Sequence, residues 1–180
     1  MIRTFVRGLA ATLALLVMVT VSASAQMASS SRFGVSAGVA LPMGDFGDAV
    51  GLGIHAGGHV MLPLGEKLKL RVNGDFGTYG GDVSGLDNIT LLGAVANVMV
   101  PITTSSALKP YFFGGLGYYQ TKANFAGGGS ADDSNLAFNV GVGYDFKPGN
   151  TNLFTELRYL SIQSEGDATN MLPIVIGLRF

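Results

Sequence analysis

The stretch Met171-Leu-Pro-Ile-Val-Ile-Gly-Leu-Arg-Phe180 decides the fold of this chain. Every second residue, counted back from the terminus, is large and apolar: Phe180, Leu178, Ile176, Ile174 and Leu172. This period of two predicts a β-strand with one apolar face. Because the strand closes on an aromatic residue, its apolar face suits lipid better than water. The stretch therefore predicts further strands of the same kind, closed into a barrel.

Residues 1–25 have the three parts of a secretory signal peptide. Arg3 and Arg7 precede an apolar run of 13 residues, Leu9–Val21, and small residues follow it in Ala23-Ser-Ala25. A membrane-spanning helix needs roughly 20 apolar residues, so the run predicts a cleaved signal rather than an anchor. The barrel domain is then expected to span residues 26–180.

Composition excludes several classes of protein. There is no cysteine, which rules out disulfides and thiolate metal sites. The formal net charge of −1 gives no electrostatic reason to expect a nucleic-acid partner. Beyond the signal, no stretch approaches 18 unbroken apolar residues. A membrane location for the mature chain would therefore require strands in a closed barrel, since backbone polar groups in lipid must all be paired.

Alternating segments recur along the whole mature chain. Eight strands are predicted, at residues 33–41, 51–62, 68–79, 89–100, 111–122, 135–146, 153–163 and 171–180. The segment 89–100 is apolar on both faces, so its facing stays ambiguous, whereas Leu116 and Tyr118 are expected to face outward. Connections after the odd-numbered strands, at 42–50, 80–88, 125–134 and 164–170, are rich in Gly, Ser and acidic residues. The two kinds of connection are expected at opposite rims of an up-and-down barrel.

Aromatic residues cluster near the predicted strand ends. Membrane barrels carry an aromatic girdle at each interface. One girdle is expected from Phe33, Tyr111, Phe112, Phe146, Phe154 and Phe180, and the other from Tyr79, Tyr118, Tyr119 and Tyr159.

With these features, the chain resembles the small outer-membrane β-barrel proteins of the OmpA/OmpX type, a porin-like family. The resemblance rests on the signal, the alternating segments, the stretch Tyr111-Phe-Phe-Gly-Gly-Leu-Gly-Tyr118 and the terminal Leu178-Arg-Phe180. It implies a Gram-negative outer membrane, contact with outer-membrane lipid and lipopolysaccharide, and a monomer. It also implies insertion by the barrel-assembly machinery, which reads the last strand at Leu172, Ile174, Ile176, Leu178 and Phe180. Members of the family include structural barrels, adhesins, narrow pores and lipid A-modifying enzymes.

The fold class expected is therefore all-β, an eight-stranded antiparallel up-and-down transmembrane barrel. A soluble lipocalin-like barrel is the rival, but it requires an apolar interior. Here the face opposite the apolar one carries Lys69, Arg71, Asp75, Asp145, Glu156, Arg158 and Arg179. These charges nearly balance, so we expect ion pairs and hydrogen bonds among them inside the barrel. The alternative is that each head group is merely hydrated in an open lumen.

The remaining candidates for chemistry are weak. His55 and His59 are four residues apart, which on a strand places them about 13 Å apart, too far for one metal ion. Neither histidine has a serine within two residues, although the sequence leaves a cross-strand Ser–His pair open. Glycines on the inward face are expected to make room for large neighbours in a narrow barrel. No cofactor or metal is predicted.

The sequence thus favours a non-enzymatic outer-membrane barrel with a structural or surface-interaction role. A narrow channel for small solutes is the leading alternative, and a lipid A-modifying hydrolase ranks third. Both termini are expected in the periplasm, because an even number of strands returns the chain to its starting side.

Overall fold

A computed structural model describes residues 32–65, 67–104, 108–164 and 166–180. The predicted signal peptide at residues 1–25 lies outside the described residues. In the part that is described, no helix is both long and apolar enough to cross a membrane.

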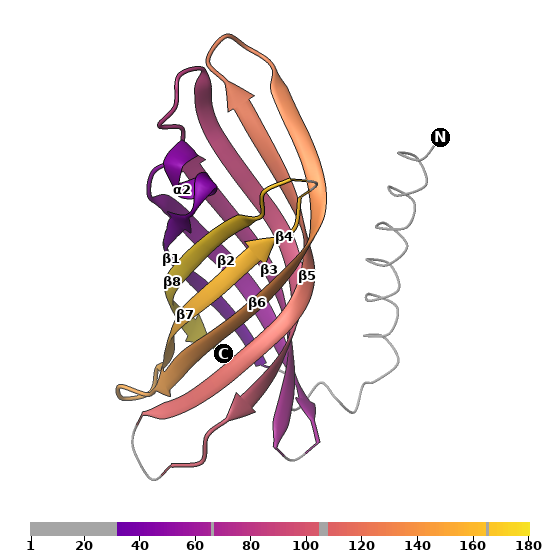
Figure 1. The fold of residues 1–180 in the computed structure, drawn as a ribbon. Coiled ribbons are helices and arrows are strands. Elements are labelled where there is room, and N and C mark those ends of the chain that lie inside the picture. The colour runs from indigo at the N-terminus through magenta and orange to yellow at the C-terminus, as the bar shows by residue number, and fades with distance from the viewer. Residues whose placement is uncertain (1–31, 66, 105–107, 165) are drawn as a thin grey trace. The chain divides into compact units, whose positions relative to one another are not determined.

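The described residues form eight strands and one short helix. These are β1 (Arg32–Met43), α2 (Asp45–Ala49), β2 (Gly53–Leu64), β3 (Leu68–Gly80), β4 (Leu86–Pro101), β5 (Lys109–Phe125), β6 (Ser130–Phe146), β7 (Asn152–Ile162) and β8 (Thr169–Arg179). Each strand pairs antiparallel with the next, and β8 pairs with β1 to close the barrel (Figure 1). The predicted eight-stranded up-and-down barrel is confirmed.

Side chains alternate between the two faces of the wall, as period two requires. In β8, Ile176 is 56% exposed while Val175 is 3% exposed. The ambiguous segment β4 is resolved in the same way, with Leu91, Val95 and Met99 buried inside and Leu92 and Val98 exposed outside. Both faces of β4 are apolar because its inward residues Leu91, Val95 and Met99 pack in the apolar clusters of the interior. Leu116 and Tyr118 face outward, as predicted.

Inward-facing glycines leave space for aromatic rings of the neighbouring strand. A Cβ added at Gly143 would lie 2.4 Å from the Tyr111 ring, and the two residues are opposite each other in β6 and β5. An added Cβ would likewise meet the neighbouring ring in the pairs Gly93 and Tyr119, Gly141 and Phe113, Gly177 and Phe154, and Gly53 and Tyr79. An eight-stranded barrel is only wide enough for side chains to fill it, so a large ring needs a vacant Cβ beside it.

These pairs correct the predicted aromatic girdles. The sequence predicts Tyr79, Tyr111, Tyr119 and Phe154 at the two interfaces, but all four are buried inside the barrel. Each of the four occupies an inward-facing position of its strand. That facing decides where the side chain lies, even when the residue is close to a strand end. Among the girdle residues, the exposed members are Phe33, Phe112, Tyr118 and Phe180.

Two connections also differ from the prediction. The segment 125–134 is predicted to be a loop, but β6 already begins at Ser130, and Asp132 and Asp133 pair with Lys122 and Thr121 of β5. Polar residues do not end a strand whose partner continues in register. The segment 42–50 contains the unpredicted helix α2, whose Phe46 is buried at one end of the barrel.

Candidate functional site: the barrel interior

The interior of the barrel is filled by two layers of side chains. The apolar layer lies at the end that carries α2, and the charge cluster lies between it and the other rim. The apolar layer consists of Ala40, Phe46, Val50, Tyr79, Leu91, Val95, Tyr119, Ala137, Leu160, Ile162 and Met171. The charge cluster consists of Arg71, Asp75, Asp145, Glu156, Arg158 and Arg179.

Helix α2 helps to close the apolar layer. The Phe46 ring meets the Tyr79 ring edge to face, with centroids 5.1 Å apart. Val50, directly after the helix, is 1% exposed and forms an isolated β-bridge with Gly81 at the start of the β3–β4 connection. The Tyr79 hydroxyl donates to the Met171 sulfur across the barrel at 2.9 Å. The first connection therefore folds back into the barrel and packs as part of its core.

Glu156 of β7 is the centre of the charge cluster. Arg71, from β3, donates to both of its carboxylate oxygens, and the longer of these bonds, from Nη2 to Oε2, is 3.2 Å. The Tyr111 hydroxyl donates to Oε1 at 2.7 Å. Arg158 and Arg179 lie farther away, with Nη2 atoms 3.8 Å and 3.5 Å from the carboxylate. Three guanidinium groups thus share one buried carboxylate.

Asp75 forms the second centre. Its Oδ2 accepts hydrogen bonds from Arg158 Nη1 and from the Tyr119 hydroxyl, both at 2.8 Å. His55 Nε2 lies 3.7 Å from the other oxygen. Because Tyr119 also belongs to the apolar layer, it joins the two layers.

Arg179 completes the cluster at the rim side. It forms an ion pair with Asp145 and donates through Nη2 to the Tyr111 hydroxyl at 2.9 Å. Aromatic faces cover the guanidinium groups, with Arg179 4.3 Å from the Phe154 ring centroid and Arg71 4.5 Å from that of Phe113. Such stacking stabilises a cation that has lost its water.

Of the seven charges singled out in the sequence, the structure brings six together. Lys69 is the exception, because it is half-buried and has no ion pair with a described acid. The sequence reasoning missed Tyr111, Tyr119 and Phe113, which provide two hydroxyl donors and a stacking face. Their signal was present: each has the inward parity of its strand and stands opposite a glycine.

The two histidines are buried on the inward face. His59 packs edge to face on Phe154, with centroids 5.3 Å apart. Among the described residues, the Nε2 atom of neither histidine has a hydrogen-bond partner. No group of three or more His, Cys, Asp or Glu residues that could hold a metal ion occurs in the described ranges.

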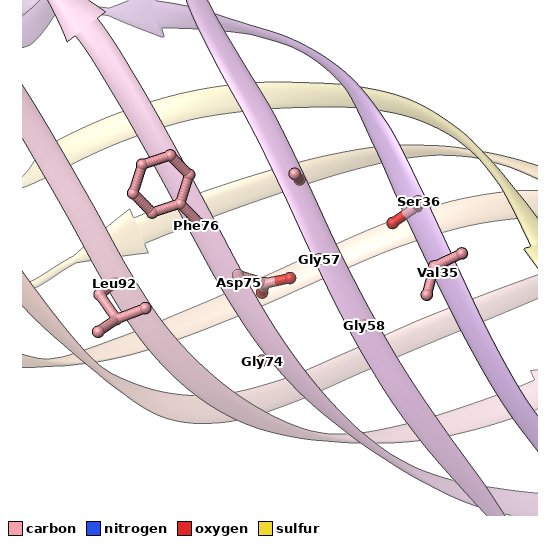
Figure 2. A pocket seen from close by; sticks show the side chains of 9 residues that line it. Val35, Ser36, Gly57, Gly58, Gly74, Asp75, Phe76 and Leu92 are labelled. Carbon is pink, nitrogen blue, oxygen red and sulfur yellow. The ribbon is translucent and has the colours of Figure 1, made fainter.

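A shallow apolar groove lies on the outer face of the wall. Gly58 and Gly74 are opposite each other in β2 and β3, and neither projects a side chain there (Figure 2). The exposed side chains of Val35, Phe76 and Leu92 border this hollow of about 430 Å³. Ser36 and Asp75 also line it, although the Asp75 carboxylate is engaged on the inner side of the wall.

Comparison with known proteins agrees with this geometry. The family model described as "Outer membrane protein beta-barrel domain" matches residues 11–180. No curated protein matches the chain.

Solved structures with the same fold are distant in sequence. Neisserial surface protein A is 18% identical, with a TM-score of 0.64 over 83% of this chain and 95% of that one. A major outer membrane protein from Thermus thermophilus is 13% identical, with a TM-score of 0.56 over 84% and 98%. The N-terminal β-barrel domain of Pseudomonas aeruginosa OprF is 16% identical, with a TM-score of 0.53 over 83% and 97%. At these identities the likeness is one of fold.

Proposed function

The chain belongs to the outer membrane protein beta-barrel domain family, and from that premise we propose that it is a closed, non-enzymatic barrel with a structural or surface-interaction role. It is an outer-membrane β-barrel protein. The single observation that carries the proposal is the filled interior. Arg71, Tyr79 and Tyr119 are among the largest fully buried side chains, and they come from both layers. A solute would have to displace an ion-paired layer and an apolar layer in turn.

The unequal lengths of the strands support the surface-interaction part of the proposal. A transmembrane strand needs about 9–11 residues. β7 and β8 have 11 residues each, whereas β4 has 16 and β5 and β6 have 17 each. The extra length raises the β5–β6 hairpin beyond the rest of the barrel at the α2 end (Figure 1). Its tip presents hydrated polar residues such as Lys122 and Asp132.

Wild-type protein in planar bilayers is expected to show no steady conductance, because side chains block the lumen at two levels. Insertion should be verified in vesicles of the same lipid by heat-modifiable gel mobility, so that a silent bilayer reports a closed barrel. Discrete conductance steps from the inserted protein would instead support the narrow-channel alternative. Release of fatty acid from lipid A by the purified protein would support the hydrolase alternative.

The proposed orientation places both termini in the periplasm and the α2 end outside the cell. An epitope inserted after Gly128, in the β5–β6 turn, is then expected to be labelled on intact cells. The matched insertion after Gly149, in the β6–β7 turn, should be labelled only after the outer membrane is permeabilised. Both sites are glycines with positive φ in turns, so neither insertion interrupts a strand. The reverse labelling pattern would contradict the proposed orientation.

A further inference from the structure

Both histidines of the chain lie inside the barrel, but their electrostatic surroundings differ. His55 and His59 belong to β2 and are 3% and 7% exposed. His55 Nε2 lies 3.7 Å from Oδ1 of Asp75, so a proton taken up by His55 would face a carboxylate. Across the part of the chain that the structure describes, no ion pair includes His59. A proton taken up by His59 would therefore have no carboxylate in contact with it.

The ring of His59 is enclosed by the strands around it. It lies over Gly34 of β1, where an added Cβ would be 2.5 Å from Nε2. It also packs on Phe154 of β7, with ring centroids 5.3 Å apart. Its Nε2 atom is closed to solvent and has no hydrogen-bond partner among the described residues. An imidazolium ion at this place would be both desolvated and unpaired, which is costly for a buried charge.

Arg179 of β8 lies close to His59. Its guanidinium carbon is 4.3 Å from the centroid of the same Phe154 ring. Arg179 and His59 are therefore within about 10 Å of each other, a distance at which salt does not fully screen two charges. The strand register agrees, because Gly34 stands opposite both residues and has no side chain to separate them. A charged His59 would repel Arg179.

Arg71 of β3 lies on the other side of His59. Asn73 stands opposite His59 in the register, and Arg71 is the next inward-facing residue of β3, which makes it a diagonal neighbour of His59. Glu156, the carboxylate that Arg71 contacts, is already engaged by both hydrogen bonds from that guanidinium group. A charged His59 would therefore stand between two arginines.

The wider surroundings of His59 are positive as well. On the four strands packed around it, the inward-facing charged residues are Arg32 of β1, Lys69, Arg71 and Asp75 of β3, Glu156 and Arg158 of β7, and Arg179 of β8. Tyr79 of β3 also faces inward and is uncharged at neutral pH. Even with Asp145 of β6, which pairs with Arg179, the cations outnumber the acids.

From this geometry we propose that His59 makes the barrel interior sensitive to acid, because its protonation adds an unpaired cation beside Arg71 and Arg179. The inference concerns regulation and goes beyond the proposed function, since it requires only the folded barrel. The repulsion acts first on the contacts of Arg179 with Phe154 and Asp145, which loosens the rim-side half of the interior.

The sign of the pH dependence follows from where the proton is accepted. An imidazole exposed to water takes up a proton near pH 6.5. The unfolded chain therefore binds the proton of His59 more readily than the folded barrel does. The stability of the barrel is then full above about pH 6.5 and is lost as the pH falls below that value.

The test measures denaturant unfolding of the full barrel in lipid vesicles at pH 7.5 and pH 5.0, followed by heat-modifiable gel mobility. In this range the carboxylates of the unfolded chain stay almost fully ionised, so the histidines are the groups that titrate. The unfolding equilibrium constant of the wild type is expected to rise roughly 30-fold on acidification, which corresponds to one imidazole protonated only in the unfolded chain. His59→Gln removes that imidazole, and its constant should change less than about threefold.

Two further variants make the test specific. His55→Gln is the matched control, because it removes the other imidazole of β2, and it should keep the wild-type response. Asn73→Asp leaves His59 in place but sets a carboxylate opposite it, and it keeps the side-chain oxygen that accepts from Asn97 at 3.1 Å. With a partner for its proton, His59 should no longer destabilise the barrel in acid, so this variant should also change less than about threefold.

Several results would overturn the inference. A wild-type unfolding constant that does not change with pH would show that His59 accepts its proton without cost. An equal response in His59→Gln would assign the acid sensitivity to other groups, and a loss of the response in His55→Gln alone would assign it to His55. If His59→Gln does not fold, an undiminished response in Asn73→Asp decides against the inference. Each of these results is obtained with a folded barrel in vesicles and leaves the proposed function standing.

Discussion

Replacing Glu156 with glutamine is expected to lower the free energy of unfolding of the barrel by about 3–5 kcal/mol, the range seen when one partner of a buried ion pair is removed. Glu156 is 3% exposed and accepts from Arg71 and Tyr111, with Arg158 and Arg179 close by. Glutamine keeps the shape but removes the charge. Three buried guanidinium groups would then face a neutral amide in a space that water barely enters. Denaturant unfolding of the barrel in lipid vesicles, followed by gel mobility, measures the difference.

Two further variants make this measurement specific. Asp133→Asn removes a carboxylate from the exposed β5–β6 hairpin and should leave the unfolding midpoint unchanged, because solvent screens that charge. Replacing Arg71 and Glu156 together by leucine should cost less than Glu156→Gln alone, since no new unpaired charge remains from that pair. If Glu156→Gln were as stable as Asp133→Asn, the charge cluster would be hydrated rather than mutually paired.

The strand count could be predicted from the alternation of apolar residues, and the closure of the barrel from the need to pair every backbone polar group in lipid. β8 is the simplest case: its outward row from Leu172 to Phe180 is apolar, and its inward row contains Arg179 and Gly177. β4 could not be oriented in this way because its outward face is apolar and its inward residues Leu91, Val95 and Met99 are apolar as well. Because lipid and the surroundings of these inward residues are both apolar, β4 reads as one continuous apolar run in the sequence. Only its register with β3 and β5 shows which residues face outward and which face inward.

The inward positions of the charges could be predicted, but their partners could not. Parity places Glu156 and Arg158 on one face of β7, but it does not say which of the other inward charges each of them meets. In the structure, Glu156 pairs mainly with Arg71, and Arg158 pairs mainly with Asp75. Arg71 and Asp75 both belong to β3, across the barrel. The residues that face each other across the barrel are determined by the stagger of the strands around it. That stagger is a property of the whole barrel, and no short pattern in the sequence encodes it.

The same limit explains the aromatic residues. The sequence shows that Tyr111 is near the start of a strand, a position typical of a membrane interface. It does not show that Gly143 stands opposite and leaves the space that the ring occupies. An aromatic residue with inward parity and a registered glycine partner is the pattern that would have predicted the interior position.

The outward row of β8 provides the second large expected effect. Replacing Ile176 with arginine should lower the free energy of unfolding in a bilayer by about 2–4 kcal/mol, because a cation near the midplane loses its hydration. Ile176 is exposed on the outer face, opposite Ala37 of β1 and Thr155 of β7, so the substitution disturbs neither interior layer. The measurement is unfolding from lipid vesicles, together with the fraction of heat-modifiable protein in the outer membrane of cells.

A depth series separates lipid burial from other effects of the substitution. Leu178 has the same outward parity but lies two residues nearer the rim, about 7 Å along the strand. Leu178→Arg should therefore cost less than Ile176→Arg, and Ile176→Leu should cost almost nothing. Deleting Phe180 tests the proposed assembly signal separately, since it should reduce the folded fraction in cells while unassisted folding into vesicles continues. Equal stability of Ile176→Arg, Leu178→Arg and the wild type would mean that this row does not face hydrocarbon.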